Sequence, residues 1–441
     1  MFLRPFRLIQ AFVLAVIGLL AIAPSAHAVP SFASQTGQPC TACHIGAFGP
    51  QLTAYGRAFK IGGYTQTGGE GVAAKIPLAA FVQGSYTHTQ ADQNGGAAPG
   101  YAGNNNFALD AVSVFLAGRI TDYAGAFIQT TYAGVGKSYF LDNSDIRVTT
   151  PIDIGDTNLR LGMSVNNGPT VQDPFNSSMV WGPPYEGSSL APTPAYEPVL
   201  MGAFQGSVLG VTAYGWYDNA LYVEAGAYKT MDDKIAKALG VYGAPGTMLN
   251  PGPYVRLAYE WDWGGQSAHV GMIGLQTAIQ PGGTIGFGTD TYTDIALDGS
   301  YQWVGDGKHT VSVIGSWTHE HQNLAASFIQ GLASNQNNTL DEFRGTVSYY
   351  YKSTYGGQLG IKEIWGNADA LYYNASPSGK PNSTGIIAEL DYVPFGKDDS
   401  WKNPWANLKL GLQYTFYPMF NGTAQGASGN NTIYAFAWLS F

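Results

Sequence analysis

The chain has few charged residues and almost no cysteine. Only 12% of its 441 residues are Asp, Glu, Lys or Arg, about half the share usual in soluble domains. Such a composition disfavours an aqueous exterior. Two cysteines exclude a disulfide-built scaffold, and a mean hydropathy of −0.06 disfavours a polytopic helical membrane protein. The chain is instead rich in glycine and aromatic residues, with 58 Gly, 28 Tyr, 21 Phe and 10 Trp, which indicates a weakly charged β-rich protein.

Long apolar runs are also lacking, apart from one at the amino terminus. Arg4 and Arg7 precede an apolar stretch over residues 11–24, which predicts a signal peptide over 1–28 with cleavage after Ala28. An uncleaved anchor is the alternative, but the run is shorter than the roughly 18 residues that a spanning helix requires. Removal of both arginines leaves 19 Lys and Arg against 30 Asp and Glu, a net charge of −11. This balance argues against nucleic acid as a partner.

From Leu78 onward, apolar and small or polar residues alternate with a period of two. In a strand these two sets lie on opposite faces of the sheet. The polar set carries few charges, as in the lumen of a barrel rather than on the wet face of a sandwich. The alternation predicts sixteen strands, near 78–89, 107–121, 124–132, 139–149, 158–165, 206–215, 220–229, 253–261, 268–280, 292–304, 309–319, 340–351, 357–365, 385–394, 407–417 and 432–441.

Connection lengths and the carboxyl end indicate an outer-membrane barrel. Connections after even strands are mostly short and those after odd strands are mostly long, as expected for periplasmic turns and external loops; the link 395–406 is an exception. The last residues form an apolar set that ends in Phe441, which resembles the assembly signal of such barrels. We therefore expect an all-β chain in the bacterial outer membrane, with a transmembrane antiparallel β-barrel over residues 76–441, contacting lipid.

One external loop is stiff. Seven of the 24 prolines lie between Asn166 and Met201, and proline fixes φ and cannot donate a ladder hydrogen bond. This is the third external loop, which in porins commonly folds into the lumen. Its apolar content favours packing inside the barrel, and a rigid exposed flap is the alternative.

Both cysteines belong to one motif, Cys40-Thr41-Ala42-Cys43-His44. In a C-x-x-C-H run, two thiols form thioethers with one haem c while the imidazole reaches the iron as proximal ligand. Zinc would need a second pair of ligands nearby, and a thioredoxin-like pair would need a βαβ context. The motif thus predicts a haem that is attached covalently to Cys40 and Cys43 and has His44 as an iron ligand.

A short helix is expected after the motif, over Gln51 to Ile61, with Leu52, Tyr55 and Phe59 on one face. Residues 29–75 are too few for a free-standing cytochrome, so we expect this segment to plug the lumen.

The sequence does not assign the sixth ligand of the haem iron. Candidates are Lys60 or Tyr55 within the segment, and Met179 in the inward loop, whereas His88 and Met163 belong to the lipid-facing set.

Further polar residues are expected at the external mouth. His319-Glu320-His321 begins an external loop in the predicted layout and offers two imidazoles on one face for a metal ion. Carboxylates expected on other loops to attract cations are Asp92, Asp232, Asp233 and Asp290.

The amino-terminal residues resemble a known family. Pro30 to Gly37, Cys40 to His44, Tyr55 to Lys60 and Gly63 to Thr65 are similar to the corresponding segment of fused outer-membrane monohaem cytochrome-porins, which include iron oxidases; the stretch Asn166 to Tyr185 is also similar. The resemblance implies haem attachment through Cys40 and Cys43, with His44 as proximal ligand.

The expected function is oxidation of extracellular Fe(II), with the electron passed through the haem to a periplasmic c-type cytochrome. The alternatives are a haem-containing diffusion porin and outward electron transfer to an extracellular acceptor.

Overall fold

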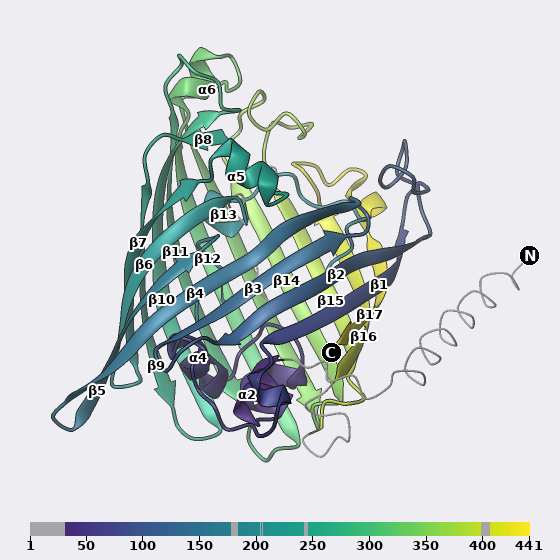
Figure 1. The fold of residues 1–441 in the computed structure, drawn as a ribbon. Helices are drawn as coiled ribbons and strands as arrows, with labels where there is room; N and C mark the ends of the chain where they lie inside the picture. The colour runs from purple at the N-terminus through teal and green to yellow at the C-terminus, as the bar shows by residue number, and fades with distance from the viewer. Residues whose placement is uncertain (1–30, 178–183, 203, 205, 242–245, 398–405) are drawn as a thin grey trace, which may run out of the picture.

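A computed structural model describes residues 31–177, 184–202, 204, 206–241, 246–397 and 406–441 (Figure 1). The expected signal peptide, residues 1–28, and the candidate ligand Met179 lie outside these residues. Within them, no helix has both the length and the apolar character needed to cross a membrane; this finding says nothing of a β-barrel.

The described strands form one closed antiparallel barrel. Seventeen strands share a single sheet, in which β1 pairs with both β2 and β17 and so joins its two ends. Strand β8 has three residues and pairs only with one end of β10, while β7 pairs directly with β9. The other sixteen strands make up the wall, so the predicted strand number and fold class are confirmed. The strands are β1 (Leu78–Thr89), β2 (Asn106–Arg119), β3 (Ala124–Ala133), β4 (Ser138–Ile154), β5 (Thr157–Asn166), β6 (Val208–Tyr217), β7 (Leu221–Thr230), β8 (Gly246–Met248), β9 (Gly252–Asp262), β10 (Gln266–Pro281), β11 (Asp290–Trp303), β12 (His309–Asn323), β13 (Asn337–Tyr351), β14 (Tyr355–Gly366), β15 (Ser383–Tyr392), β16 (Asn407–Met419) and β17 (Thr432–Ser440).

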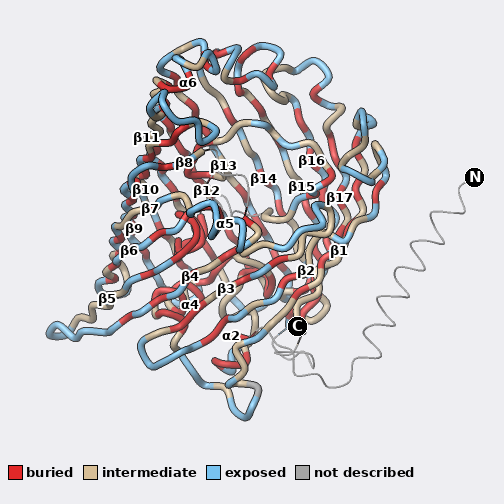
Figure 2. Tube along the Cα trace, turned by 45° about the horizontal axis from the view of Figure 1, so that its top comes forward, coloured by how far each residue is buried: buried red, intermediate tan, exposed pale blue. Residues whose placement is uncertain are grey.

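Burial alternates along the strands, as Figure 2 shows. In β9, Val255 and Leu257 are exposed whereas Arg256 and Glu260 are buried. Apolar side chains thus face outward and polar ones inward, the reverse of a soluble barrel, because the exterior meets lipid.

Exposed aromatic residues gather near the short turns, where an aromatic girdle is expected at the membrane interface. They are Tyr123, Tyr217, Tyr259, Trp261, Trp263, Tyr301, Tyr349, Tyr351, Tyr355 and Tyr392. A closed barrel with an apolar exterior and such a girdle belongs in a bacterial outer membrane.

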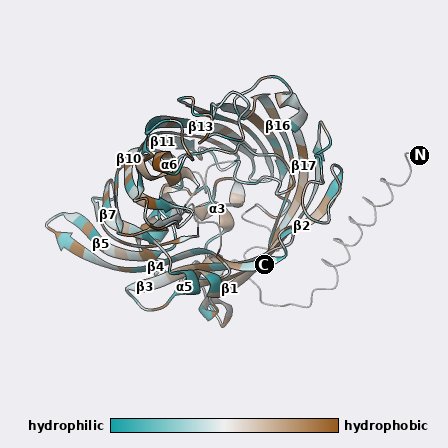
Figure 3. Cartoon of the chain, turned by 90° about the horizontal axis from the view of Figure 1, so that it is seen from above, coloured by the Kyte–Doolittle hydropathy of each residue, from teal (hydrophilic) through white to brown (hydrophobic). Residues whose placement is uncertain are grey.

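The amino-terminal segment lies at the same end of the barrel as the carboxyl terminus (Figure 1). It contains α2 (Ser31–Thr36), α3 (Cys40–Cys43), η1 (Ile45–Ala47), α4 (Ala54–Ile61) and η2 (Ala73–Lys75). Seen along the barrel, α3 lies within the ring of strands (Figure 3). The long connections at the opposite end carry η4 (Val199–Met201), α5 (Asp233–Ala238), α6 (Ala325–Ile329) and η5 (Ala427–Asn430), none of which the sequence pattern predicts.

Helix α4 differs from its prediction at its start. The hydroxyl of Thr53 accepts a hydrogen bond from the Gly56 N–H at 3.2 Å and caps the helix. Leu52 lies before this cap and forms an isolated β-bridge with His44, so the predicted helical face that included Leu52 is wrong. The predicted end at Ile61 is confirmed.

Candidate functional site

The C-x-x-C-H motif is folded by local backbone bonds. Helix α3 spans Cys40–Cys43, and the His44 N–H closes it on the Cys40 carbonyl at 2.9 Å. Residues three apart in a helix lie on one face, so both thiols point to the same side. The chain beyond the motif returns beside it: Ile45 N–H donates to the Gln51 carbonyl and Thr53 N–H donates to the Cys43 carbonyl, each at 2.9 Å. The motif is therefore a rigid unit.

Both cysteines and His44 line one cavity of about 490 Å³, a size within the range of small-molecule and cofactor sites. Its walls come from the amino-terminal segment, the inward loop, the first four strands and the last two. The aromatic lining consists of Phe32, Phe48, Phe59, Tyr64, Phe81, Phe115, Phe127, Tyr185 and Trp438. Polar lining residues include Lys60, Gln83, Gln129, Thr131, Asp142, Asn143, Asn176 and Glu186. The cavity combines a mainly apolar wall with a few polar groups, as a flat amphipathic cofactor requires.

Burial shifts the pKa values of two residues of the motif. Burial lowers the pKa of His44 to about 4, opposed by a hydrogen bond with the Gly49 backbone, so the ring is neutral as a metal ligand must be. Its Nδ1 atom is buried without a hydrogen-bond partner. Burial, together with the neighbouring Cys40, raises the pKa of Cys43 to about 12, so this thiol lacks the lowered pKa of an activated redox cysteine. The residues present fit a covalently attached haem.

Helix α4 is fixed to the inner wall by a buried arginine. The Arg57 side chain donates from Nε and Nη2 to Glu260 Oε1 at 2.8 and 2.5 Å. Nη1 bonds Gln302 at 3.0 Å and Nη2 bonds Ser267 at 2.9 Å. These partners belong to three neighbouring strands, β9, β10 and β11, and both members of the ion pair are nearly inaccessible to water. Such a set of bonds holds the helix in one orientation.

The inward loop packs on the same helix. Residues 166–177 are all buried, which supports the predicted inward course over an exposed flap. The ammonium of Lys60 donates to the carbonyls of Val171 and Asp173 at 2.7 and 2.8 Å and to the side chain of Asn176 at 3.1 Å. Asn176 donates in turn to the Pro50 carbonyl at 2.5 Å. The loop and the amino-terminal segment are thus bonded to each other inside the barrel.

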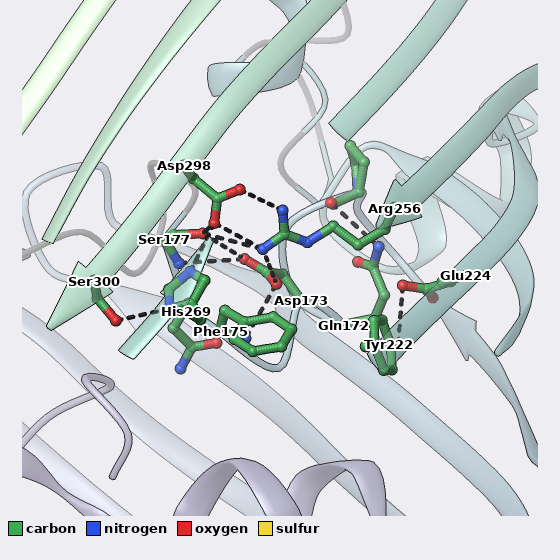
Figure 4. Close-up of polar contacts among 12 residues, drawn as sticks. Gln172, Asp173, Phe175, Ser177, Tyr222, Glu224, Arg256, His269, Asp298 and Ser300 are labelled. Atoms are coloured by element: carbon green, nitrogen blue, oxygen red, sulfur yellow. Dashed lines mark hydrogen bonds and ion pairs between the residues drawn. The ribbon is translucent and has the colours of Figure 1, made fainter. Parts of the chain in front are cut away.

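An ionic network attaches this loop to the wall (Figure 4). Arg256 on β9 pairs with Asp298 on β11 at 2.7 Å and with Asp173 of the loop at 3.4 Å. His269 on β10 bonds Asp298 at 2.9 Å and Ser300 at 2.7 Å. Because these charges are buried, loss of one partner would leave an uncompensated charge, and the loop position is strongly fixed.

A second anchor holds the end of the segment. The Tyr64 hydroxyl donates to Asp145 at 2.6 Å, and Arg147 pairs with the same carboxylate at 2.8 Å. The Tyr64 ring stacks on Phe32, with 5.2 Å between centroids. Arg147 also donates to the Gln172 carbonyl of the inward loop, so strand β4 binds both the segment and the loop.

The candidates for the sixth iron ligand lie in different parts of the barrel. Lys60 lines the cavity, but its ammonium makes the three bonds described above; Tyr55 is not part of the lining. His88 and Met163 lie on the outward-facing set, as predicted, with Met163 54% exposed. Among the described lining residues, His44 is the only histidine and none is a methionine.

The expected mouth residues are partly corrected. Strand β12 continues to Asn323, so His319, Glu320 and His321 do not begin a loop. The two imidazoles share the outer face, while Glu320 is buried inside and accepts the Val199 N–H at 2.6 Å. Over the described ranges, no group of three or more His, Cys, Asp or Glu side chains is arranged to hold a metal ion.

Two of the four loop carboxylates have structural partners in helix caps. Asp290 is buried and accepts the Ala326 and Ser327 N–H groups at 2.9 Å, which caps α6, so its expected role in attracting cations is wrong. Asp232 caps α5 by accepting the Lys234 N–H at 2.9 Å. Asp92 accepts a bond from Asn104 at 3.0 Å, and Asp233 is exposed.

Comparisons with solved structures return outer-membrane barrels. The chain is similar to the outer membrane channel DcaP of Acinetobacter baumannii, with 13% identity, a TM-score of 0.47 and coverage of 82% of this chain and 96% of that one. An anion-selective porin from Comamonas acidovorans gives 12% identity and a TM-score of 0.44 over 82% and 98%; Salmonella typhi OmpF gives 12% and 0.47 over 82% and 97%. No protein-family model and no curated protein sequence matches the chain.

Proposed function

We propose that this outer-membrane barrel binds one covalent haem c and transfers electrons from extracellular Fe(II) to a periplasmic c-type cytochrome. The observation that carries the proposal is the convergence of Cys40, Cys43 and His44 on one largely aromatic cavity inside the barrel. When bound there, the haem supplies a one-electron iron couple.

The residues of the site have separate roles. The thiols of Cys40 and Cys43 would hold the haem through two thioether bonds, and a neutral His44 nitrogen would bind its iron. The aromatic lining, with Phe59 and Phe127 among it, keeps water from the cofactor and lowers the local dielectric, which tunes its reduction potential. The barrel wall separates the cavity from lipid.

The segment and the inward loop together act as a plug in this proposal. Lys60 and Asn176 bond them to each other, and Arg57 bonds the segment to the wall. A plug keeps the cofactor reachable from the aqueous phases while restricting diffusion through the lumen. The segment lies at the end of the barrel with the short turns, which suits a periplasmic acceptor, and external carboxylates such as Asp233 attract Fe²⁺ without binding it tightly.

A diffusion porin is the second candidate, because the closed sixteen-stranded wall is an architecture that porins share. In that case the haem segment would stabilise or regulate the pore. Outward electron transfer would use the same site in the opposite direction. The reduction potential of the haem would decide between the two directions.

Stopped-flow mixing of the oxidised full-length protein with Fe²⁺ tests the proposal. We expect the haem absorption bands to change to those of the reduced form at the pH of the native habitat. A Cys40→Ala/Cys43→Ala variant, which has no thiol left for a thioether bond, should lose covalent haem and show no such change. Haem-loaded wild-type protein that Fe²⁺ does not reduce would refute the iron-oxidase function.

A further inference from the structure

The cavity contains an unused hydrogen-bond donor on the barrel wall. Of the described residues that line it, two have buried side-chain polar atoms without a partner, His44 Nδ1 and Trp438 Nε1. The imidazole has a role in the proposed function. The indole N–H has none, and a buried donor without an acceptor costs free energy.

Packing fixes the orientation of Trp438. It lies on β17 between Gln83 of β1 and Lys409 of β16. Its ring makes edge contacts with Phe48 at 4.7 Å and Phe81 at 5.3 Å between centroids. Phe48 follows the haem motif by four residues, so the indole borders both the motif and the wall.

Its neighbours on the inner wall already have partners. Gln83 donates to Glu186 at 2.5 Å and to Tyr434 at 3.0 Å. Lys409 donates to Glu389 at 2.8 Å, and Asn407 donates to the Ala47 carbonyl at 2.7 Å. The indole N–H of Trp438 therefore remains available to a group that enters the cavity.

An indole can only donate a hydrogen bond, and a carboxylate is the strongest common acceptor. A haem carries two carboxylates, its propionates, on one edge of an otherwise apolar ring. We propose that Trp438 is a positioning residue that donates its indole N–H to a haem propionate. This inference rests on the proposed haem site and adds the residue that orients the propionate edge.

The test compares Trp438→Phe with wild type in the haem-loaded, full-length protein. Phenylalanine keeps an aromatic ring among Phe48, Phe81 and Tyr185 but removes the N–H. Trp261→Phe, on the lipid-facing side of β9, is the matched control. Covalent haem content, the propionate bending bands in resonance Raman spectra and the reduction potential are measured for each.

We expect Trp438→Phe to retain haem, to shift the propionate bands and to lower the reduction potential, because an uncompensated carboxylate stabilises ferric iron. Trp261→Phe should match wild type in all three. A haem-loaded Trp438→Phe protein with unchanged bands and potential would overturn the role of Trp438 and leave the haem site standing. Wild type without covalent haem would overturn both.

A second measurement serves if Trp438→Phe does not fold. Ultraviolet resonance Raman difference spectra of wild type against the haem-free Cys40→Ala/Cys43→Ala variant report indole hydrogen bonding. A stronger indole hydrogen bond in the haem-loaded protein supports the proposal, and identical indole bands refute it.

Discussion

Arg57 brings a buried positive charge into the lumen on a helix of eight residues, opposite Glu260. Removing one member of such a pair costs about 3–5 kcal/mol, whereas replacing both by apolar residues of similar volume is often neutral. We predict that Arg57→Met weakens the docking of α4 by this amount and that Arg57→Met/Glu260→Met restores most of it. Hydrogen exchange of residues 54–61 measures the docking free energy. Equal loss of protection in the single and double variants would show that the cost does not come from leaving the Glu260 carboxylate unpaired.

Among the individual residues of the candidate site, only some could be predicted from sequence. Cys40, Cys43 and His44 are adjacent in the chain, and their spacing alone indicates haem chemistry. Trp438 and Glu186 line the same cavity but are far from the motif in sequence, and no local pattern connects them to it. The sequence offers Lys60 only as a candidate iron ligand, whereas in the structure its ammonium donates to carbonyls of the inward loop.

The inward loop carries a carboxyl group whose protonation affects its position. Glu186 accepts a hydrogen bond from Gln83, and burial raises its pKa to about 8. The folded state thus favours the protonated acid. The folding stability that this preference contributes is fully present below the unfolded pKa of about 4.5 and is lost as pH rises through 8. We predict that residues 184–190 lose exchange protection over this range in wild type, relative to Glu186→Gln. The same pH dependence in both proteins would exclude Glu186 as the cause.

Whole elements differ in how well the sequence predicts them. The sixteen wall strands follow from period-two alternation, because one face of each meets lipid and the other the lumen. This alternation does not predict elements whose position depends on residues distant in the chain. Helix α6 depends on the Asp290 carboxylate of β11 as its cap, and β12 extends through Glu320 because β11 and β13 pair with it on both sides. Neither partner is visible in the local sequence.

For the whole molecule, the wall and the segment are separable. All barrel strands lie between Leu78 and Ser440, so closure of β1 on β17 needs no residue of the segment. The segment contributes side chains to the lumen, through Arg57, Lys60 and Tyr64. The wall can therefore close without the segment. The two proposed functions predict opposite effects of the segment on ion flow through the lumen.

We predict that the full-length, haem-loaded protein conducts ions far less in planar bilayers than a variant lacking residues 31–75. The deletion removes the side chains that bond the inward loop and the inner wall, which leaves space in the lumen for water and ions. Both proteins should show the same heat-modifiable migration on gels, which controls for barrel assembly. Equal, large conductance in the two would favour the diffusion porin, because a segment that does not restrict the lumen cannot act as a plug there.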